Sequence, residues 1–133
     1  MWWIKKFKKI NIRCGSLTNK LSKCLLLNSL PIDVINVAII NYNGVFEIFN
    51  DITKLINFKK LSFLSCKFTT NISSIFDLTN LESLKLTGEF IDIKNIFGNI
   101  NKLSNLKYLY IDDNLFKKIS CYLIDTPFKI III

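Results

Sequence analysis

Three stretches of the chain repeat one order of apolar and polar residues. Segments 52–63, 75–86 and 100–111 align without gaps as I-x-x-L-x-N-[LF]-x-x-L-x-[LIF]. The last two apolar positions are two residues apart, so they share one face of a short strand. The first two are three residues apart, which suits a helical or 3₁₀ turn with one apolar side. The pattern therefore predicts short strands that stack in parallel and alternate with helical turns.

Weaker copies extend this pattern toward both ends. Segments 7–12, 34–39 and 128–133 keep the apolar positions, so the copies start near 7, 34, 58, 81, 106 and 128. The spacings are 27, 24, 23, 25 and 22 residues. In the long first copy, helical spacing predicts a short helix from Leu17, Leu21, Cys24 and Leu25. We expect one domain, residues 1–133, of about five and a half copies.

The repeated unit resembles the leucine-rich repeat family, whose core is L-x-x-L-x-L-x-x-N-x-L with a period of about 20–29 residues. Segment 106–116, LKYLYIDDNLF, matches every position, and segment 58–68 matches with Cys66 in the Asn place. The resemblance implies an α/β leucine-rich-repeat solenoid with parallel strands on its concave face and short helical or 3₁₀ turns on its convex face. It also implies that Asn114 and Cys66 bond backbone groups of adjoining turns.

The last copy ends in the apolar run Ile130–Ile133. Repeat arrays need end copies with a polar outer side, and an exposed apolar edge strand is prone to associate with another chain. We therefore expect either a chain truncated at its C-terminus or association through the Ile130–Ile133 edge, and we favour truncation.

Composition excludes several classes of function. Half of the residues are hydrophobic, which excludes a wholly disordered chain. There is no His, the usual general base and commonest metal ligand, and no glycine-rich phosphate-binding motif. Asp112 and Asp113 are the only adjacent acidic pair, and neighbours on a strand face opposite ways. We predict no enzyme, no cofactor, and glycines placed in turns.

Cysteine and hydropathy patterns add little to this prediction. The four cysteines, at positions 14, 24, 66 and 121, contain no C-x-x-C pair, so buried thiols are favoured over a metal site. Met1–Ile10 is basic and aromatic, which suits a first strand with its flank or, less favoured, a membrane-surface contact. No signal peptide or transmembrane segment is seen, so we expect a cytoplasmic protein.

The outward strand positions form three columns, whose residues the core does not dictate. The second-position column is Lys9, Asn36, Lys60, Ser83, Tyr108 and Ile130. The fourth-position column is Asn11, Ala38, Ser62, Lys85, Tyr110 and Ile132. The sixth-position column is Arg13, Ile40, Leu64, Thr87 and Asp112. Among these residues we predict a binding face with apolar and aromatic anchors and with charged residues that set complementarity: Ile40, Leu64, Tyr108 and Tyr110, with Lys60, Lys85 and Asp112.

By the family resemblance, the function is non-enzymatic binding of a protein partner of unknown identity on the concave face. Two alternatives stay open. With 18 Lys and Arg against 10 Asp and Glu, the net charge of +8 allows polyanion or nucleic-acid binding through a lysine-rich surface. Arg13 alone offers bidentate phosphate geometry, so nucleic acid is the less favoured partner. The chain could also be a structural fragment of a longer repeat protein.

Overall fold

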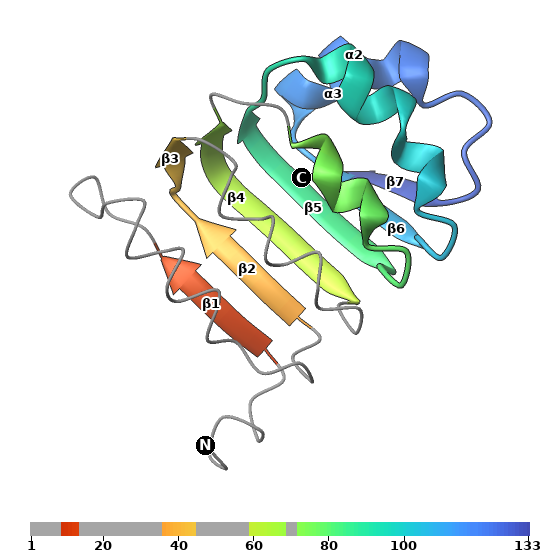
Figure 1. Ribbon diagram of the computed structural model, residues 1–133. Coiled ribbons are helices and arrows are strands. Elements are labelled where there is room, and N and C mark those ends of the chain that lie inside the picture. Colours follow the sequence, from red (N-terminus) through yellow and green to blue (C-terminus); the bar gives the residue numbers. More distant parts are fainter. Residues whose placement is uncertain (1–8, 14–35, 45–58, 69–71) are drawn as a thin grey trace.

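A computed structural model describes residues 9–13, 36–44, 59–68 and 72–133. Their strands form one all-parallel sheet in which chain order is also spatial order, β1-β2-β4-β5-β6-β7, with β3 beside β4 (Figure 1). The strands are β1 Lys9–Arg13, β2 Asn36–Ile40, β3 Asn43–Gly44, β4 Lys60–Phe68, β5 Ser83–Glu89, β6 Tyr108–Ile111 and β7 Lys129–Ile132. The predicted parallel sheet is therefore confirmed for the described strands.

Short helical segments follow β4, β5 and β6. They are η4 Ser73–Asp77, α2 Ile93–Gly98, η5 Ile100–Lys102, α3 Asp113–Ile119 and η6 Ser120–Tyr122. The apolar pairs three residues apart, Ile75 with Leu78 and Ile100 with Leu103, are buried in or beside η4 and η5, as the spacing predicts. The result is an α/β arrangement. The matching pair in segment 52–63 and the helix predicted for 17–25 lie outside the described residues.

The core lies between the sheet and these helical segments. Alternate residues of the central strands enter it, for example Leu61 and Phe63 of β4 and Leu84 and Leu86 of β5, all almost fully buried. Phe68 packs its ring against Phe63, with ring centroids 5.3 Å apart. Burying one such side chain contributes about 1.5–3 kcal/mol relative to exposure, so the inward rows account for much of the stability of the sheet.

Hydrogen bonds between neighbouring copies tie the strands together at both ends. Near the strand starts, the Asn105 side chain donates to the Thr79 carbonyl, at 2.9 Å. Near the strand ends, Cys66 Sγ donates to the Ile39 carbonyl, at 3.3 Å. Cys66 therefore bonds the backbone of the preceding copy, as the resemblance implies. Asn114 is instead an exposed residue of α3, so the same expectation is not met in its copy.

Glu82 adds an ionic bridge across three copies at the strand starts. Its carboxylate lies 2.9 Å from Lys107 Nζ and 3.7 Å from Lys59 Nζ. Lys59, Glu82 and Lys107 are the residues directly before β4, β5 and β6, respectively. The hydrogen bond and charge of Lys107, with a smaller contribution from Lys59, lower the pKa of Glu82, and the same contact raises the pKa of Lys107. Charge of opposite sign thus alternates along this edge of the sheet.

The alignment of the last copy is wrong by one residue. A start at 128 places Ile130 and Ile132 in the outward columns, but β7 pairs Tyr108 with Lys129 and Leu109 with Ile130. Ile130 therefore packs against the core, and Lys129 and Ile131 take the outward rows. Four consecutive isoleucines carry no alternation, so the sequence pattern alone cannot fix this register.

The prediction that every glycine lies in a turn is wrong for the three described glycines, since Gly44 ends β3, Gly98 ends α2 and Gly88 lies within β5. Gly88 lies inside β5 with a φ of +124°, which L side chains rarely adopt. The reason is an irregularity in β4, where the register shifts between Phe63 and Cys66 and Ser65 has a φ of 54°. This bulge brings the Cys66 backbone so close that a Cβ at position 88 would clash with the Cys66 carbonyl oxygen.

Candidate binding groove on the outward face of the sheet

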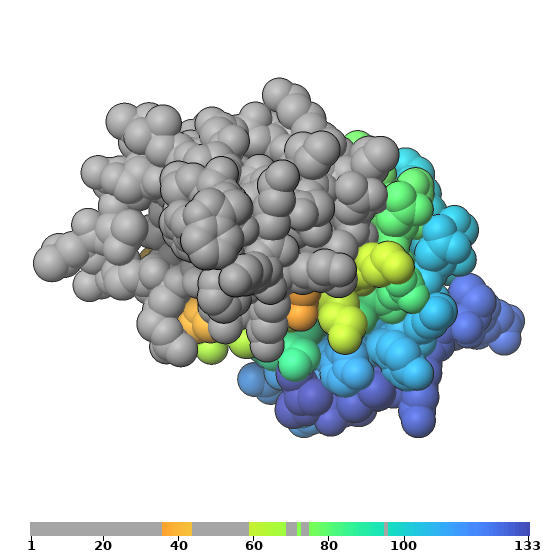
Figure 2. Space-filling model, turned by 90° about the horizontal axis from the view of Figure 1, so that it is seen from below, coloured from red at the N-terminus to blue at the C-terminus, as the bar shows by residue number. Residues whose placement is uncertain are grey.

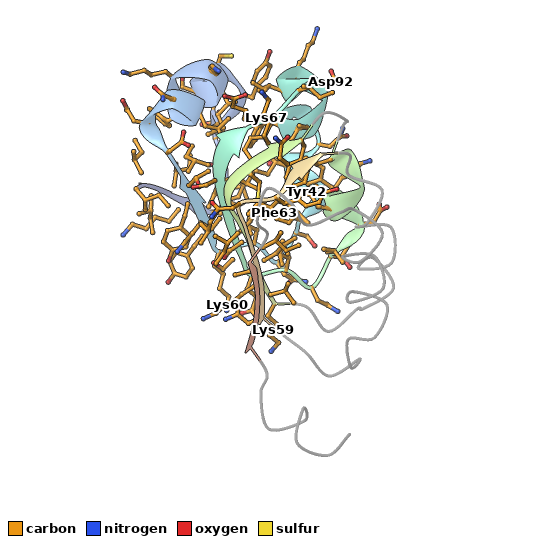
Figure 3. The ribbon with its side chains drawn as sticks, turned by 90° about the vertical axis from the view of Figure 1, so that its left-hand side faces the viewer. Tyr42, Lys59, Lys60, Phe63, Lys67 and Asp92 are labelled. Carbon is orange, nitrogen blue, oxygen red and sulfur yellow. The ribbon has the colours of Figure 1, made fainter. Side chains whose placement is uncertain are left out.

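A groove of about 310 Å³ crosses the sheet on the face opposite the core. It is formed by outward residues of β2, β4, β5 and β6, which are Asn36, Ala38, Ile40, Lys60, Ser62, Leu64, Ser83, Lys85 and Tyr110. Strand alternation produces this set, because each of these residues neighbours a buried one along its strand. In Figure 3 the Lys60 side chain projects from the lower end of the sheet, whereas Phe63 lies in the packed middle of the molecule.

The groove brings together five of the seven residues that the sequence singled out. Ile40, Lys60, Leu64, Lys85 and Tyr110 all line it. They come from four neighbouring strands, whose residues follow one another from orange to blue in the view from below (Figure 2). The spacing of the copies was sufficient to find them, because the pairing of β2, β4, β5 and β6 follows the predicted alignment.

Tyr108 flanks the groove without lining it. Its ring centroid is 6.3 Å from that of Tyr110, two residues along the same strand, and its side chain is 43% exposed. The register places Lys129 beside Tyr108 and Ile131 beside Tyr110, so β7 continues this face beyond the groove. Two adjacent tyrosines with exposed surface are typical of contact surfaces for other proteins.

The groove is positively charged. Among the described residues that line it, Lys60 and Lys85 are charged and none carries a carboxylate. Neither ammonium group is within ion-pair distance of a carboxylate in the described part of the chain, unlike Lys59 and Lys107, which share Glu82. The Lys85 Nζ instead lies 5.1 Å from the centre of the Tyr110 ring, a cation–π contact. Two cations are thus available to a ligand.

The other part of the groove is apolar. Ile40 of β2 and Leu64 of β4 are paired in the sheet register and are both half-buried, and Ala38 beside them is buried. Along β4 the outward residues change from Lys60 through Ser62 to Leu64. The groove therefore has Lys60 near the strand starts, Lys85 beside Ser62 in its middle, and an apolar end near the strand ends.

Asp112 lies elsewhere and its carboxylate is occupied. One oxygen accepts a hydrogen bond from the Leu115 N–H at 2.7 Å and caps α3, and the other accepts from the Gly88 N–H at 3.1 Å. Thr87, in the same column, accepts from the Ser65 N–H through its hydroxyl at 2.8 Å. These two members of the sixth-position column join strands within the chain. An Asp at the start of a helical stretch is the favoured N-cap residue, so the sequence did contain the signal for this role.

A larger hollow of about 880 Å³ lies at the carboxyl ends of β4 and β5, and the sequence did not predict it. It is lined by Lys67, Phe68, Gly88, Glu89, Phe90, Ile91, Asp112, Asn114, Lys117 and Lys118. Several of its charges already have partners, because Lys67 pairs with Glu89 at 3.5 Å and Lys117 with Asp113 at 3.0 Å. The smaller groove, with two cations unpaired within the described segments, is therefore the stronger candidate site.

The predictions on metal ligands, membrane spans, cysteines and the first strand are only partly addressed by the described residues. Among the residues the structure describes, no three His, Cys, Asp or Glu side chains cluster as metal ligands, and no helix could span a membrane. Cys66 is buried and Cys121 is exposed, whereas Cys14 and Cys24 lie outside the described segments. The first predicted strand is present as β1, and most of Met1–Ile10 lies outside the description.

The apolar edge remains a prediction. Strand β7 is the last in the spatial order of the described sheet, and Ile132 and Ile133 are 48% and 53% exposed. Association through Ile130–Ile133 and continuation by further copies would both cover these side chains.

Comparison of the chain with protein-family models, with curated proteins and with solved structures finds no match. A functional conclusion therefore depends on the residues and geometry of the chain itself.

Proposed function

We propose that this chain is a non-enzymatic protein-interaction module of the leucine-rich-repeat type, which binds a protein partner in the groove on the outward face of its sheet. The observation that carries the proposal is the convergence of Ile40, Lys60, Leu64, Lys85 and Tyr110 on one groove. Each occupies a position that the core does not dictate.

The repeat architecture supports the proposal. Successive copies place one strand each beside the last, and helical segments follow β4, β5 and β6 on the opposite side of the core. Such stacking gives a solenoid in which each copy contacts its neighbours and presents an extended row of outward side chains. We infer that the groove face is the concave face of this solenoid.

The chemistry of the face supports a protein partner. Interfaces between proteins are enriched in aromatic residues, and the strongest contributors to affinity sit near apolar neighbours that exclude water. Tyr108 and Tyr110 supply the aromatic surface, and Ile40 and Leu64 supply the apolar one. Asp112 is omitted from the anchors because both of its oxygens bond within the chain.

The test is affinity capture from a lysate of the source at physiological salt, comparing wild type with the variant L64A/Y108A/Y110A. A matched control, I91A/Y122A/I124A, truncates three other exposed hydrophobic residues outside the groove. We expect a protein captured by wild type and by the control to be lost by the groove variant, with circular dichroism confirming that all three fold. Equal capture by all three would refute binding through the groove.

A further inference from the structure

We propose that the groove selects an extended acidic protein segment, with carboxylates seated at Lys60 and Lys85 and aliphatic side chains seated at Ile40 and Leu64. This inference rests on the proposed function and adds the chemistry of the partner. It is carried by charge complementarity, because the described residues that line the groove include two cations and no carboxylate.

The groove lysines differ from several lysines close to them in the chain or at the same edge of the sheet. Lys59, Lys67, Lys107 and Lys117 each have a carboxylate within 4 Å in the chain. Lys60 follows Lys59 directly, yet its side chain is on the groove side and has no such partner in the described segments. An incoming carboxylate therefore gains a new ion pair at Lys60 or Lys85 without displacing an existing one.

The spacing suits an extended chain. Lys60 pairs with Ser83 and Ser62 with Lys85, so the two lysines are diagonal neighbours on adjacent strands. From the usual strand spacing and rise, their backbones are about 8 Å apart. Side chains two residues apart on one side of an extended segment are separated by roughly 6.6 Å. Two carboxylates at positions i and i+2 can thus meet both lysines. Leu64 follows Ser62 by two residues on β4, so it is in turn a diagonal neighbour of Lys85, and Ile40 is its partner on β2.

The same geometry disfavours nucleic acid. A base would stack on an open aromatic face, but the Lys85 ammonium covers one side of the Tyr110 ring at 5.1 Å. Ala38, Ile40 and Leu64 offer no donor to a phosphate, and the whole chain contains a single Arg, at position 13. A polyanion without apolar groups would leave this end of the groove uncovered.

The test is a fluorescence-anisotropy titration of the full chain with labelled synthetic peptides. The probe is Glu-Ser-Glu-Ser-Leu-Ser-Leu, which places two carboxylates and two leucines on one side when extended. Its controls replace both Glu by Gln or by Lys, and a thymidine oligonucleotide serves as the nucleic-acid probe. We expect the Glu peptide to bind about tenfold tighter than the Gln peptide, as two surface ion pairs allow, and this advantage to shrink as salt rises.

Two protein variants separate local from overall charge. K60E/K85E reverses the groove lysines, and K94E/K102E makes the same change in net charge at exposed positions on α2 and η5, outside the groove. We expect K60E/K85E to lose at least about tenfold in affinity for the Glu peptide and K94E/K102E to stay within about twofold of wild type.

Several results would overturn the proposal. The Glu peptide could fail to bind, or the Glu and Gln peptides could bind equally well. K60E/K85E and K94E/K102E could lose equal affinity for the Glu peptide. The oligonucleotide could bind more tightly than the Glu peptide, and K60E/K85E could abolish that binding. If a captured partner still depends on Leu64, Tyr108 and Tyr110 but not on Lys60 and Lys85, the acidic segment is excluded while the protein-binding role stands.

Discussion

The two faces of the same strands follow different rules. Phe63 points into the core and is 0% exposed, whereas Leu64, the next residue, is half-buried and lines the groove. The core side is apolar in every central strand. The groove side holds Asn36, Lys60, Ser83 and Tyr108 in one row across four strands. The difference indicates that the fold constrains one face and leaves the other open to a partner.

Truncating two neighbouring residues of β4 tests most directly whether the two faces of the sheet differ in their contribution to stability. We expect Phe63→Ala to lower the free energy of unfolding by about 3–5 kcal/mol, because it leaves a cavity in the core. Leu64→Ala should cost about 1 kcal/mol or less, since its side chain is already part exposed. Urea unfolding monitored by circular dichroism measures both. Similar losses for the two variants would show that the groove face is also structural.

Substitutions at Gly88 test the bulge in β4, where the regular alternation of inward and outward residues is interrupted. Gly88→Ala must tolerate a positive φ, which costs about 1–3 kcal/mol, and also a clash with the Cys66 carbonyl. Gly98→Ala is the matched control, because nothing lies within 4 Å of a Cβ there and Ala favours helix. We expect a clear loss of stability for the first variant and none for the second in the same unfolding assay. Equal stability of the two would mean that the bulge relaxes freely.

Asp112 tests whether the sixth-position column serves the fold or a partner. Asp112→Ala removes the α3 cap and the bond to Gly88, so we expect a loss of about 1–2 kcal/mol. Asp112→Asn keeps a capping oxygen and should cost less. Thermal unfolding measures both, and peptide binding in the groove should be unchanged in either variant. A stable Asp112→Ala protein with weakened binding would return Asp112 to the binding face.

The smallest effect is expected from the ionic bridge at Glu82. The hydrogen bond and charge of Lys107, and to a lesser extent Lys59, lower the pKa of Glu82 from its ordinary value, so ionised Glu82 stabilises the fold above that ordinary value. This contribution is lost as pH falls through the lowered pKa, where the carboxylate becomes protonated. The thermal midpoint of wild type should therefore exceed that of Glu82→Gln at neutral pH and converge with it in acid. A difference that does not change with pH would assign the effect to packing.

The outward residues of β2, β4, β5 and β6 could be predicted because the repeated apolar positions fix how these copies align, and the strand pairing follows that alignment. The register of β7 could not, since Ile130–Ile133 reads the same in either alignment. The larger hollow was also beyond the sequence pattern, because it is lined by residues after β4, β5 and β6 that come together only through the bulge and the start of α3. The capping role of Asp112 was not predicted for a different reason. Asp112 is both the last outward residue of its copy and the residue before a helix, and the sequence prediction used only the first of these positions.

The side-chain bonds between copies also bear on how the chain folds. They join residues 22 to 27 positions apart along the chain. Each added strand therefore closes a loop of nearly constant length, and the entropy lost in loop closure grows only with the logarithm of that length. For the solenoid that we propose, folding is a series of similar steps, which can begin at any adjacent pair of strands and spread in both directions. A whole copy inserted between β4 and β5 would add one such step without lengthening the others.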